Sequence, residues 1–466
     1  MSVKAGKVLT VGNGFLVDRL QSTGGSGVNF PEERILETGN ELAVDTVSDT
    51  PQVSIELESL DTTVETEAIL INVDETTLSD GDIIDLRDAK PLDIVSPVKG
   101  AGTSKDTVAG VIWGQCQLES ATWRYGVRQN ATQSFSLTSD SQYIGVYTPY
   151  RQEWAAAGTG PYAFTNTAIK TVEKGSDLYA LAVCIHESDG TYTPLFHGAD
   201  YTNTSAGFTL VSAAPGGSTV SACYFSATDT TFAQTVHPTP SVKPAAVRGK
   251  DIEFYLGVGP TRVFDGATTS ADATLTATGG AFTSADVGAL IEATGVPAGT
   301  TILTVTNSTT VELSANATAT AASVEVTLRP PLVWWRGVQS VDVSWRVQME
   351  REEELGNPHN VASDYDVPEV GGSITMRPST IDYLVEKAAQ IAGVPTTQIS
   401  NLLQSALLEL QIRINHPSTG SRLKTFRCRD ARVRPPAFGA RVNQKVEPQF
   451  QWTSASGDLE IIKGAP

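Results

Sequence analysis

Short runs of alternating apolar and polar residues recur along most of the chain. Clear examples are VSIEL at 53–57, SFSL at 134–137, DIEFYL at 251–256 and VDVSWRV at 341–347. A period of two places successive side chains on opposite faces of a strand, so these runs predict antiparallel sheets with one face in the core. Turn residues separate the runs, and we therefore expect a mainly β protein.

Helical patterns are few. One helix is expected over 381–391, where apolar residues share a face, and Gly393 ends it. A second helix is expected from about 396 through 410, and a short third helix after Asp61. The apolar positions that define the second and third helices are Leu402, Leu403, Leu407 and Leu410, and Val64, Ala68 and Ile69.

Residues 265–327 differ in composition from the rest of the chain. They contain no Lys or Arg and are rich in Thr, Ala, Gly and Val, with short strand-like runs such as ATLTA, TILTV, TVEL and SVEVTL. The flanking segments read as two interrupted strands of another domain. We therefore predict a small all-β, immunoglobulin-like module at 259–330 that is inserted in a host domain, because an insertion at a loop tip costs its host little.

A second embellishment is expected at 178–225. There an alternating strand, the turn Ala214-Pro215-Gly216-Gly217 and another strand follow one another. This order predicts a β-hairpin.

The chain also resembles itself at a constant offset. ERILETGN at 33–40 reappears as EREEELGN at 350–357, and the match continues without a gap as far as Val64 and Ile381, each pair 317 residues apart. The matched stretch comprises a charged segment, a Gly-Asn turn, a strand and a helix start. Upstream, LQS at 20–22 matches VQS at 338–340.

The downstream match is weaker but keeps the same order. GQCQLESATWR at 114–124 resembles TFRCRDARVRP at 425–435, which pairs Cys116 with Cys428. SFSLTS from 134 likewise resembles QFQWTS from 449. Ordered matches indicate a duplication. We divide the chain into a first domain at 1–240 and a second at 241–466, with the small module inserted in the second.

The charge balance excludes some classes of function. The chain has 466 residues, with 33 Lys+Arg against 52 Asp+Glu, and a net charge of −19. A chain this acidic is a poor candidate for gripping nucleic acid by its phosphates. A hydrophobic content of 40% is too high for a disordered protein. We find neither an apolar run of about 18 residues nor a secretory signal, so we expect no membrane span.

Candidate chemistry is sparse. The cysteines are Cys116, Cys184, Cys223 and Cys428, and the histidines are His186, His197, His237, His359 and His416. None forms a CxxC pair or a metal-ligand spacing, so buried thiols and satisfied or exposed imidazoles are expected. A Cys184–Cys223 disulfide is the alternative if their strands are neighbours.

Other patterns also lack a partner motif. Val11-Gly12-Asn13-Gly14 lacks the Lys-Ser/Thr of a P-loop, and the acid pair Asp364/Asp366 is common in any acidic chain. The glycosylation sequons at Asn130, Asn203, Asn307 and Asn316 mean little without a secretory route. We expect no catalytic, cofactor or metal site, and no enzyme.

Several segments together resemble the tail tube (major tail) proteins of long-tailed bacteriophages. The segments are EREEELGN, PEVGGSITMRPSTIDYLVEKA, the run LKTFRCRDARVRPPAFGARVNQKVEPQFQWTSASGDLEII, the phrase ADYTNTSAGFTLVSAAPGGSTVSACY and the inserted DGATTSADATLTATGGAFTSADVGALIEATGVPAGTTI. The resemblance implies two tandem β-sandwich or barrel domains, each with a flanking helix. It also implies rings that stack into a tube for DNA ejection into the host. Two domains in one chain resemble the minority of tube proteins whose trimeric rings imitate six-fold symmetry.

The same resemblance implies partners and a location. The partners are other copies of the chain, the tape measure protein, and tail terminator or baseplate proteins. Double-stranded DNA passes through the lumen without specific binding, and no membrane is involved. The location is the virion tail, after synthesis in the host cytoplasm. An external module favours a non-contractile tail, because a contractile sheath wraps the tube closely. In this setting, the charge run Glu350–Glu354 is either a solvated loop or, with its duplicate at 33–37, a contact with the neighbouring ring.

Simple geometry is compatible with a conduit. Four strands from each of six domains give a barrel ~48 Å across at ~4.8 Å spacing and ~40° tilt, and roughly 38 Å after side chains are subtracted. A duplex about 20 Å wide passes through such a bore, and an acidic wall would let it slide. The alternative is another β protein of the virion: a receptor-binding, adhesin or decoration protein. A tube-like duplication distinguishes the first class from the second.

Overall fold

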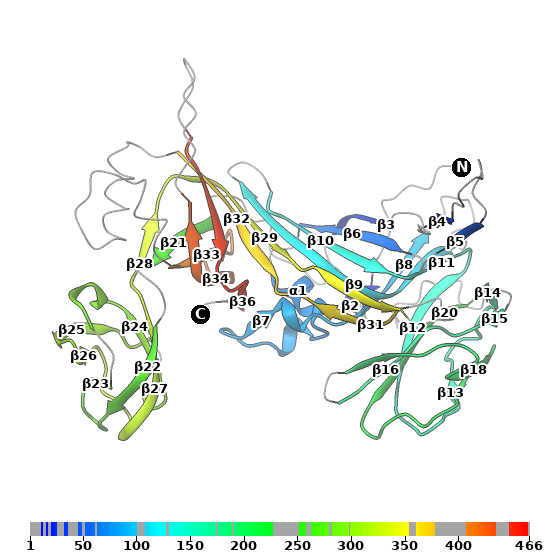
Figure 1. Ribbon diagram of the computed structural model, residues 1–466, viewed down its shortest axis with the longest axis horizontal. Coiled ribbons are helices and arrows are strands. Elements are labelled where there is room, and N and C mark those ends of the chain that lie inside the picture. The colour runs from blue at the N-terminus through cyan, green and yellow to red at the C-terminus, as the bar shows by residue number, and fades with distance from the viewer. Residues whose placement is uncertain are drawn as a thin grey trace, which may run out of the picture.

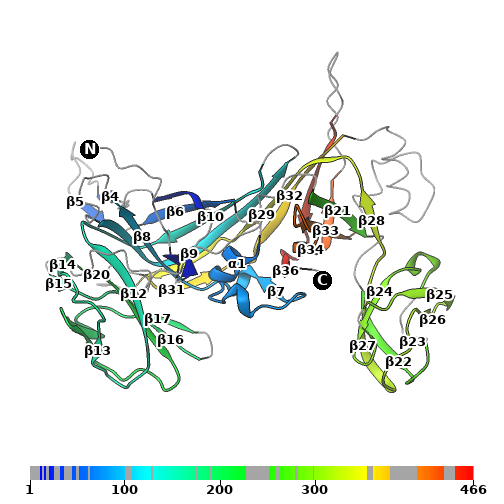
Figure 2. The ribbon, with the colours of Figure 1, turned by 180° about the vertical axis from the view of Figure 1, so that it is seen from behind.

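The computed structural model describes a mainly β protein. The described residues are 11–12, 15–16, 20–25, 32–35, 45–48, 52–60, 63–99, 108–126, 130–173, 176–188, 191–226, 251–257, 262–278, 282–297, 299–353, 360–377, 407–434 and 447–464. A large body of antiparallel strands forms the centre, and two smaller β modules lie at its ends (Figures 1 and 2). In both views the modules and helix α1 (Glu65–Leu70) lie on the same side of the central sheet.

Eight strands run side by side through this centre in one antiparallel sheet, here called the main sheet. In spatial order they are β3 (Leu20–Gly25), β6 (Val53–Ser59), β10 (Thr132–Ser139), β9 (Val108–Gly126), β29 (Val338–Arg346), β32 (Glu369–Met376), β35 (Gln449–Ser454) and β34 (Arg422–Val433). The runs at 53–57, 134–137 and 341–347 therefore form strands, as their alternation predicts.

A second layer covers the apolar face of the main sheet. Its strands are β1 (Val11–Gly12), β2 (Phe15–Leu16), β8 (Leu92–Lys99) and β11 (Ser141–Gly145), then β21 (Ile252–Gly257), β28 (Leu332–Trp335), β33 (Leu408–Asn415), β36 (Glu460–Lys463) and β7 (Ile83–Asp85). Helix α1 and the 3-10 turns η1 (Glu75–Thr77) and η2 (Leu86–Asp88) lie between β6 and β8 in the chain. β9 and β34 pass from one layer to the other, and one continuous core fills the space between the layers.

The two halves of this body repeat each other strand for strand. The first repeat is β1, β2, β3, β6, β8, β9, β10 and β11, and the second repeat is β21, β28, β29, β32, β33, β34, β35 and β36, in corresponding order. Thr23 lies opposite Leu57 as Val341 lies opposite Ile374. The β3–β6 and β29–β32 ladders shift register at corresponding positions, and so do the β8–β9 and β33–β34 ladders. The duplication predicted from the 317-residue offset is thus present in the strand pairing.

The sequence match that pairs Cys116 with Cys428 is wrong by three residues. Relative to its neighbouring strand, Leu118 occupies the position that Val433 occupies in the second repeat, so the offset there is 315. Cys116 therefore corresponds to Ala431. A shared residue type is a weaker guide than a hydrogen-bonded register, since the register fixes which face every side chain takes.

The two acidic segments of the internal match form corresponding hairpins. Their strands are β4 (Glu32–Ile35) with β5 (Asp45–Ser48), and β30 (Met349–Glu353) with β31 (Asn360–Tyr365). Glu33 lies opposite Val47, and Glu350 lies opposite Asp364, which is the same register. A solvated loop is therefore wrong for Glu350–Glu353. The Gly-Asn pairs of both segments lie outside the described residues.

Residues 148–226 form a module with its own core, here called the side module. Its strands are β12 (Thr148–Ala155), β13 (Tyr162–Ala163), β14 (Thr171–Glu173), β15 (Ser176–Leu178), β16 (Leu181–His186), β17 (Tyr192–Pro194), β18 (Tyr201–Thr204), β19 (Gly207–Leu210) and β20 (Thr219–Ser226). The hairpin expected over 178–225 is wrong, because β19 and β20 flank the turn but join different sheets. β20 is buried on both faces and needs a neighbour on each edge, which a hairpin does not supply.

Residues 262–329 form a second separate unit, here called the inserted module. Its strands are β22 (Arg262–Thr268), β23 (Thr274–Thr278), β24 (Leu290–Ala293), β25 (Ile302–Asn307), β26 (Thr310–Leu313) and β27 (Ala321–Arg329), with the turn η4 (Ser284–Asp286). All six strands belong to one sheet, whose two end strands are linked by hydrogen bonds such as Ile302 N to Ala289 O at 2.9 Å. The arrangement is therefore a closed sheet, not the two-sheet sandwich expected for an immunoglobulin-like module.

The inserted module occupies the place of a tight turn. β21 and β28, which flank it, pair as a hairpin, as predicted for the run at 251–256 and its interrupted partner. Their counterparts β1 and β2 pair in the same way, and only Asn13 and Gly14 separate them in the sequence. Gly12 corresponds to Leu256, and Phe15 corresponds to Val333.

The helix predictions fare unevenly. The short helix after Asp61 is confirmed as α1. The helix expected over 381–391 lies outside the described residues. The end of the next expected helix is wrong, because Leu408–Asn415 is strand β33. Its residues LELQIRIN alternate strictly, and Leu408, Leu410, Ile412 and Ile414 are all buried, so the period-two signal applies there.

A buried ion pair joins the repeats inside the core. Lys424 Nζ on β34 lies 2.5 Å from Glu67 Oε1 on α1, and both side chains are fully buried. Trp123 Nε1 donates to the same carboxylate oxygen at 2.8 Å, and Lys424 Nζ also donates to Gln133 Oε1 at 3.3 Å. Burial makes each charge dependent on the other, because an isolated ion pays a large desolvation cost.

We expect the Lys424→Met variant to lose about 3–5 kcal/mol of unfolding free energy, because the Glu67 charge is left buried alone. The double variant Glu67→Gln/Lys424→Met is expected to recover most of that loss. Urea unfolding followed by tryptophan fluorescence measures both. Equal losses in the single and double variants would show that the buried charge is not the cause.

We also expect the inserted module to be dispensable for folding of its host. Joining Leu256 to Val333 through Asn-Gly copies the sequence between β1 and β2, and Asn-Gly favours the two-residue hairpin turn. The shortened chain is expected to stay soluble, with β-type circular dichroism and one cooperative melting transition. Aggregation of this variant, while a Gly/Ser-linked variant also fails, would identify the module as part of the host core.

Candidate assembly interface

The seam between the two repeats is a strand ladder. β9 and β29 are antiparallel over seven residue pairs, from Ser340 opposite Gly126 to Arg346 opposite Ser120. Within it Asp342 lies directly opposite Arg124, so opposite charges meet across the seam on its polar face. The seam therefore makes the main sheet continuous from one repeat to the other.

The second layer carries its own part of the seam. β36 of the second repeat pairs with β7, which belongs to the first half of the chain, and Ile461 lies opposite Ile84. Both of these side chains are fully buried. Lys463 Nζ donates to the carbonyl oxygens of Glu75 and Leu78 at 2.8 and 2.7 Å. The repeats are thus joined in both layers.

The counterparts of these joined strands lie at the other end of the first repeat. β29 has partners on both edges, whereas its counterpart β3 pairs only with β6 within the described part of the chain. Likewise β36 pairs with β34 and β7, whereas its counterpart β11 pairs, among the described residues, only with β9. An edge with unpaired backbone groups is a template for another strand.

The apolar side chains change with the pairing. Ile144 on β11 corresponds to Ile461 on β36, because Ile144 lies opposite Val111 as Ile461 lies opposite Phe426. Ile461 is 0% exposed, and Ile144 is 73% exposed. Val146 and Tyr147 extend the exposed apolar surface beyond the end of β11. The first repeat therefore presents uncovered the surface that the second repeat buries under β7.

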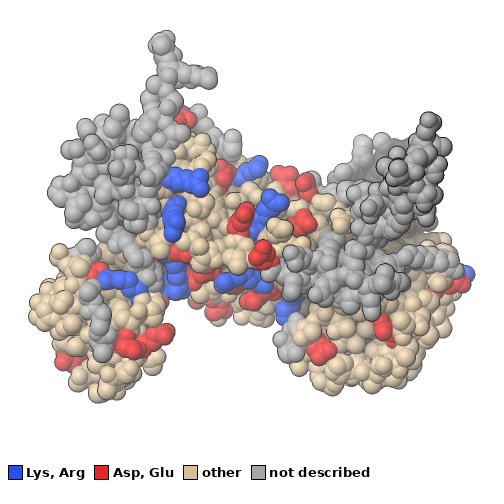
Figure 3. Space-filling model, in the orientation of Figure 1, with Lys and Arg blue, Asp and Glu red and all other residues tan. Residues whose placement is uncertain are grey.

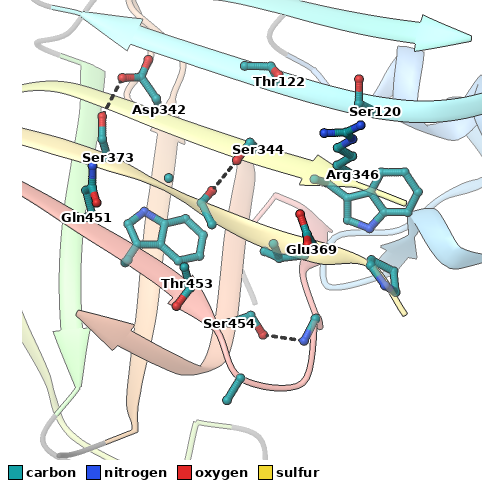
Figure 4. A pocket seen from close by; sticks show the side chains of 18 of the residues that line it. Ser120, Thr122, Asp342, Ser344, Arg346, Glu369, Ser373, Gln451, Thr453 and Ser454 are labelled. Atoms are coloured by element: carbon teal, nitrogen blue, oxygen red, sulfur yellow. Dashed lines mark hydrogen bonds between the residues drawn. The ribbon is translucent and has the colours of Figure 1, made fainter. Parts of the chain in front are cut away.

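The face of the main sheet that lies away from the core is polar. Cross-strand rows of small side chains run over it, and one such row is Glu58, Ser134, Thr122, Ser344, Gly371, Thr453 and Arg432. Over the second repeat this face is hollowed into a groove of about 960 Å³ (Figure 4). Ser373 donates to Asp342 Oδ2 at 2.9 Å, and Ser344 donates to the Gly371 carbonyl oxygen at 3.1 Å.

Charges of both signs are mixed on this polar face. Along its rows the charged residues are Glu56, Glu58, Asp342, Glu369, Arg124, Arg346, Arg432 and Arg434. Acids and bases are equal in number there, and Figure 3 shows both colours intermixed across the middle of the molecule. An acidic wall is therefore wrong for the described part of this face.

The residues considered for chemistry serve the fold. All four cysteines are buried and free, so Cys184 and Cys223 do not form a disulfide although β16 and β20 are neighbours. Burial raises the pKa of the Cys184 and Cys223 thiols well above the ordinary value and that of Cys428 to about 12. Thiols held in the protonated form are poor nucleophiles.

The nearest approach to a nucleophile–base pair is equally enclosed. His186 Nε2 lies 2.9 Å from Ser221 Oγ, but Ser221 is 0% exposed on β20. The sequon residue Asn203 accepts hydrogen bonds from the backbone of Tyr179 and Ala180. His237 and His359 lie outside the described residues, and of the pair Asp364/Asp366 only the Asp366 side chain is described, as exposed.

Among the described residues, no group of three or more His, Cys, Asp or Glu side chains is arranged to hold a metal ion. No helix in the described ranges is long and apolar enough to span a membrane.

Comparison with known proteins adds no family to this geometry. No protein-family model matches the sequence. No curated protein sequence is significantly similar to it.

We expect Ile144→Asp to weaken self-association while leaving the unfolding free energy within about 0.5 kcal/mol, because the side chain is exposed in the single chain. The matched control is Ile461→Ala, which removes a buried side chain and is expected to cost about 2–5 kcal/mol. Sedimentation velocity reports the first effect and urea unfolding the second. Unchanged assembly of Ile144→Asp would mean that this surface has no role in association.

Proposed function

We propose that this protein is a self-assembling structural subunit of a phage tail tube, whose stacked rings form a conduit for DNA ejection. The observation that carries the proposal is the seam. It joins the trailing edge of the first repeat to the leading edge of the second, and the leading edge of the first repeat has no such neighbour in the described chain. A contact of this head-to-tail kind closes into a ring when its rotation divides a full turn.

The strand count supports a ring of three chains. Each chain contributes eight adjacent strands to the main sheet, four from each repeat. Three chains then supply roughly 24 strands and, at ~4.8 Å spacing and ~40° tilt, a backbone circle ~48 Å across. A duplex about 20 Å wide has room inside such a ring.

The arrangement of the layers supports the same orientation. The polar face of the main sheet is the face without a second layer, so in this proposal it lines the bore. The side module and the inserted module lie on the other side, together with α1 (Figures 1 and 2). They would therefore project outward, away from the passing DNA, and leave the bore clear.

The surface of the bore would act by balance of charge, not by repulsion. Ser, Thr and Gly occupy the middle of the polar rows, and the charged residues on them balance. Such a wall has no net positive charge with which to hold phosphates. In this proposal the partners are other copies of the chain, with tape measure, terminator and baseplate proteins at the tube and its ends.

A cryo-electron microscopy reconstruction without imposed symmetry tests the proposal. We expect stacked rings of three chains, with one inserted module and one side module protruding per chain. Rings of six chains would contradict the two-repeat interpretation, and a purified protein that remains monomeric at high concentration and low ionic strength would contradict self-assembly.

A further inference from the structure

The open edge of β3 has a counterpart whose partner is known. β29 receives β9 at residues 120–126, and β34 corresponds to β9 with an offset of 315. In the sequence, β34 is followed by residues 435–441, which by that offset correspond to 120–126. We infer that residues 435–441 of a second copy of this chain pair with β3, in the register of the β9–β29 seam. This inference rests on the proposed function.

The register follows residue by residue from the internal seam. Ser340 lies opposite Gly126, so its counterpart Ser22 is assigned to Arg441 of the second copy. Asp342 lies opposite Arg124, so Gly24 is assigned to Gly439. Strand addition to an open edge contributes backbone hydrogen bonds whatever the side chains are, and the side chains then select the register.

The sequence pattern of the segment fits this register. The positions that correspond to the core-facing residues Ala121, Trp123 and Tyr125 are Pro436, Phe438 and Ala440, which are all apolar. The alternate positions, on the polar side, are Ala437, Gly439 and Arg441. A slip by one residue would bring Arg441 to the core side, which its charge forbids.

Charge favours the same alignment. Glu58 lies directly opposite Ser22 on the next strand, on the polar face. Arg441 of the second copy would therefore lie two strands from Glu58 with only a serine between them. Strands are about 4.8 Å apart, so both long side chains can reach across that gap. The internal seam brings together opposite charges in the same face, at Arg124 and Asp342.

A disulfide test addresses the register directly. Directly opposed residues of antiparallel strands have Cα atoms about 4.5–5.5 Å apart, which suits a disulfide. The variants are Ser22→Cys and Arg441→Cys, mixed as two separate full-length chains and oxidised mildly. We expect a covalent heterodimer on a non-reducing gel. The matched controls are Ser22→Cys mixed with Ala440→Cys, which is one residue out of register, and the single chain carrying Gly126→Cys and Ser340→Cys, which is expected to cross-link internally.

The double variant Ser22→Cys/Arg441→Cys extends the test to closure. We expect its cross-linked ladder to end at three chains, with no larger covalent species. Equal cross-linking of the out-of-register control, or no cross-linking in particles that microscopy shows to be tubes, would overturn the assigned register and leave the proposed function standing. Cross-linking in register that continues into open polymers without rings would support the strand pairing and contradict the tube. Absence of both cross-links and assembly would overturn both.

Discussion

The backbone ladder between β9 and β29 is the contact on which the remaining contacts between the repeats depend. Its seven residue pairs place α1 beside β34, where Glu67 meets Lys424, and bring β7 beside β36. A slip of one residue would turn Trp123 out of the core and Arg124 into it. The register is therefore held twice, by the hydrogen bonds of the ladder and by the side chains that the ladder sorts between two faces.

The duplication gives this chain both a formed and an unformed version of the same contact. Ile461 and Ile144 sit at corresponding positions of corresponding strands, and only the covering strand β7 differs between their surroundings. Their exposures, 0% and 73%, measure what that strand covers. An exposed isoleucine alone is ordinary on a protein surface, but an exposed isoleucine whose counterpart is buried identifies an edge that its own chain leaves uncovered.

Sequence periodicity was informative where strands have one face in the core and one in solvent. VSIEL and VDVSWRV lie in the main sheet, and their alternation was enough to predict them. It was less informative for β20, which is buried on both faces, and for Leu408–Asn415, where an apolar period of two was taken for part of a helix. The seam could not be predicted at all, because strand pairing between Trp123 and Val343 depends on backbone groups that every residue carries. The internal offset showed that two halves exist, but it did not show how they meet.

The position of the inserted module has a consequence for the order in which the chain folds. In the first repeat a hairpin closes over two residues, whereas in the second the same hairpin must close over about seventy. If that segment were unstructured, loop closure would cost roughly 3 kcal/mol more. Arg262 and Leu328 lie opposite each other where the module begins and ends, so a folded module holds its two ends at strand-pairing distance and removes this cost. The module is thus placed to fold first and to act as a template for the hairpin, and the half of the chain that carries it would acquire its structure from the insertion inward.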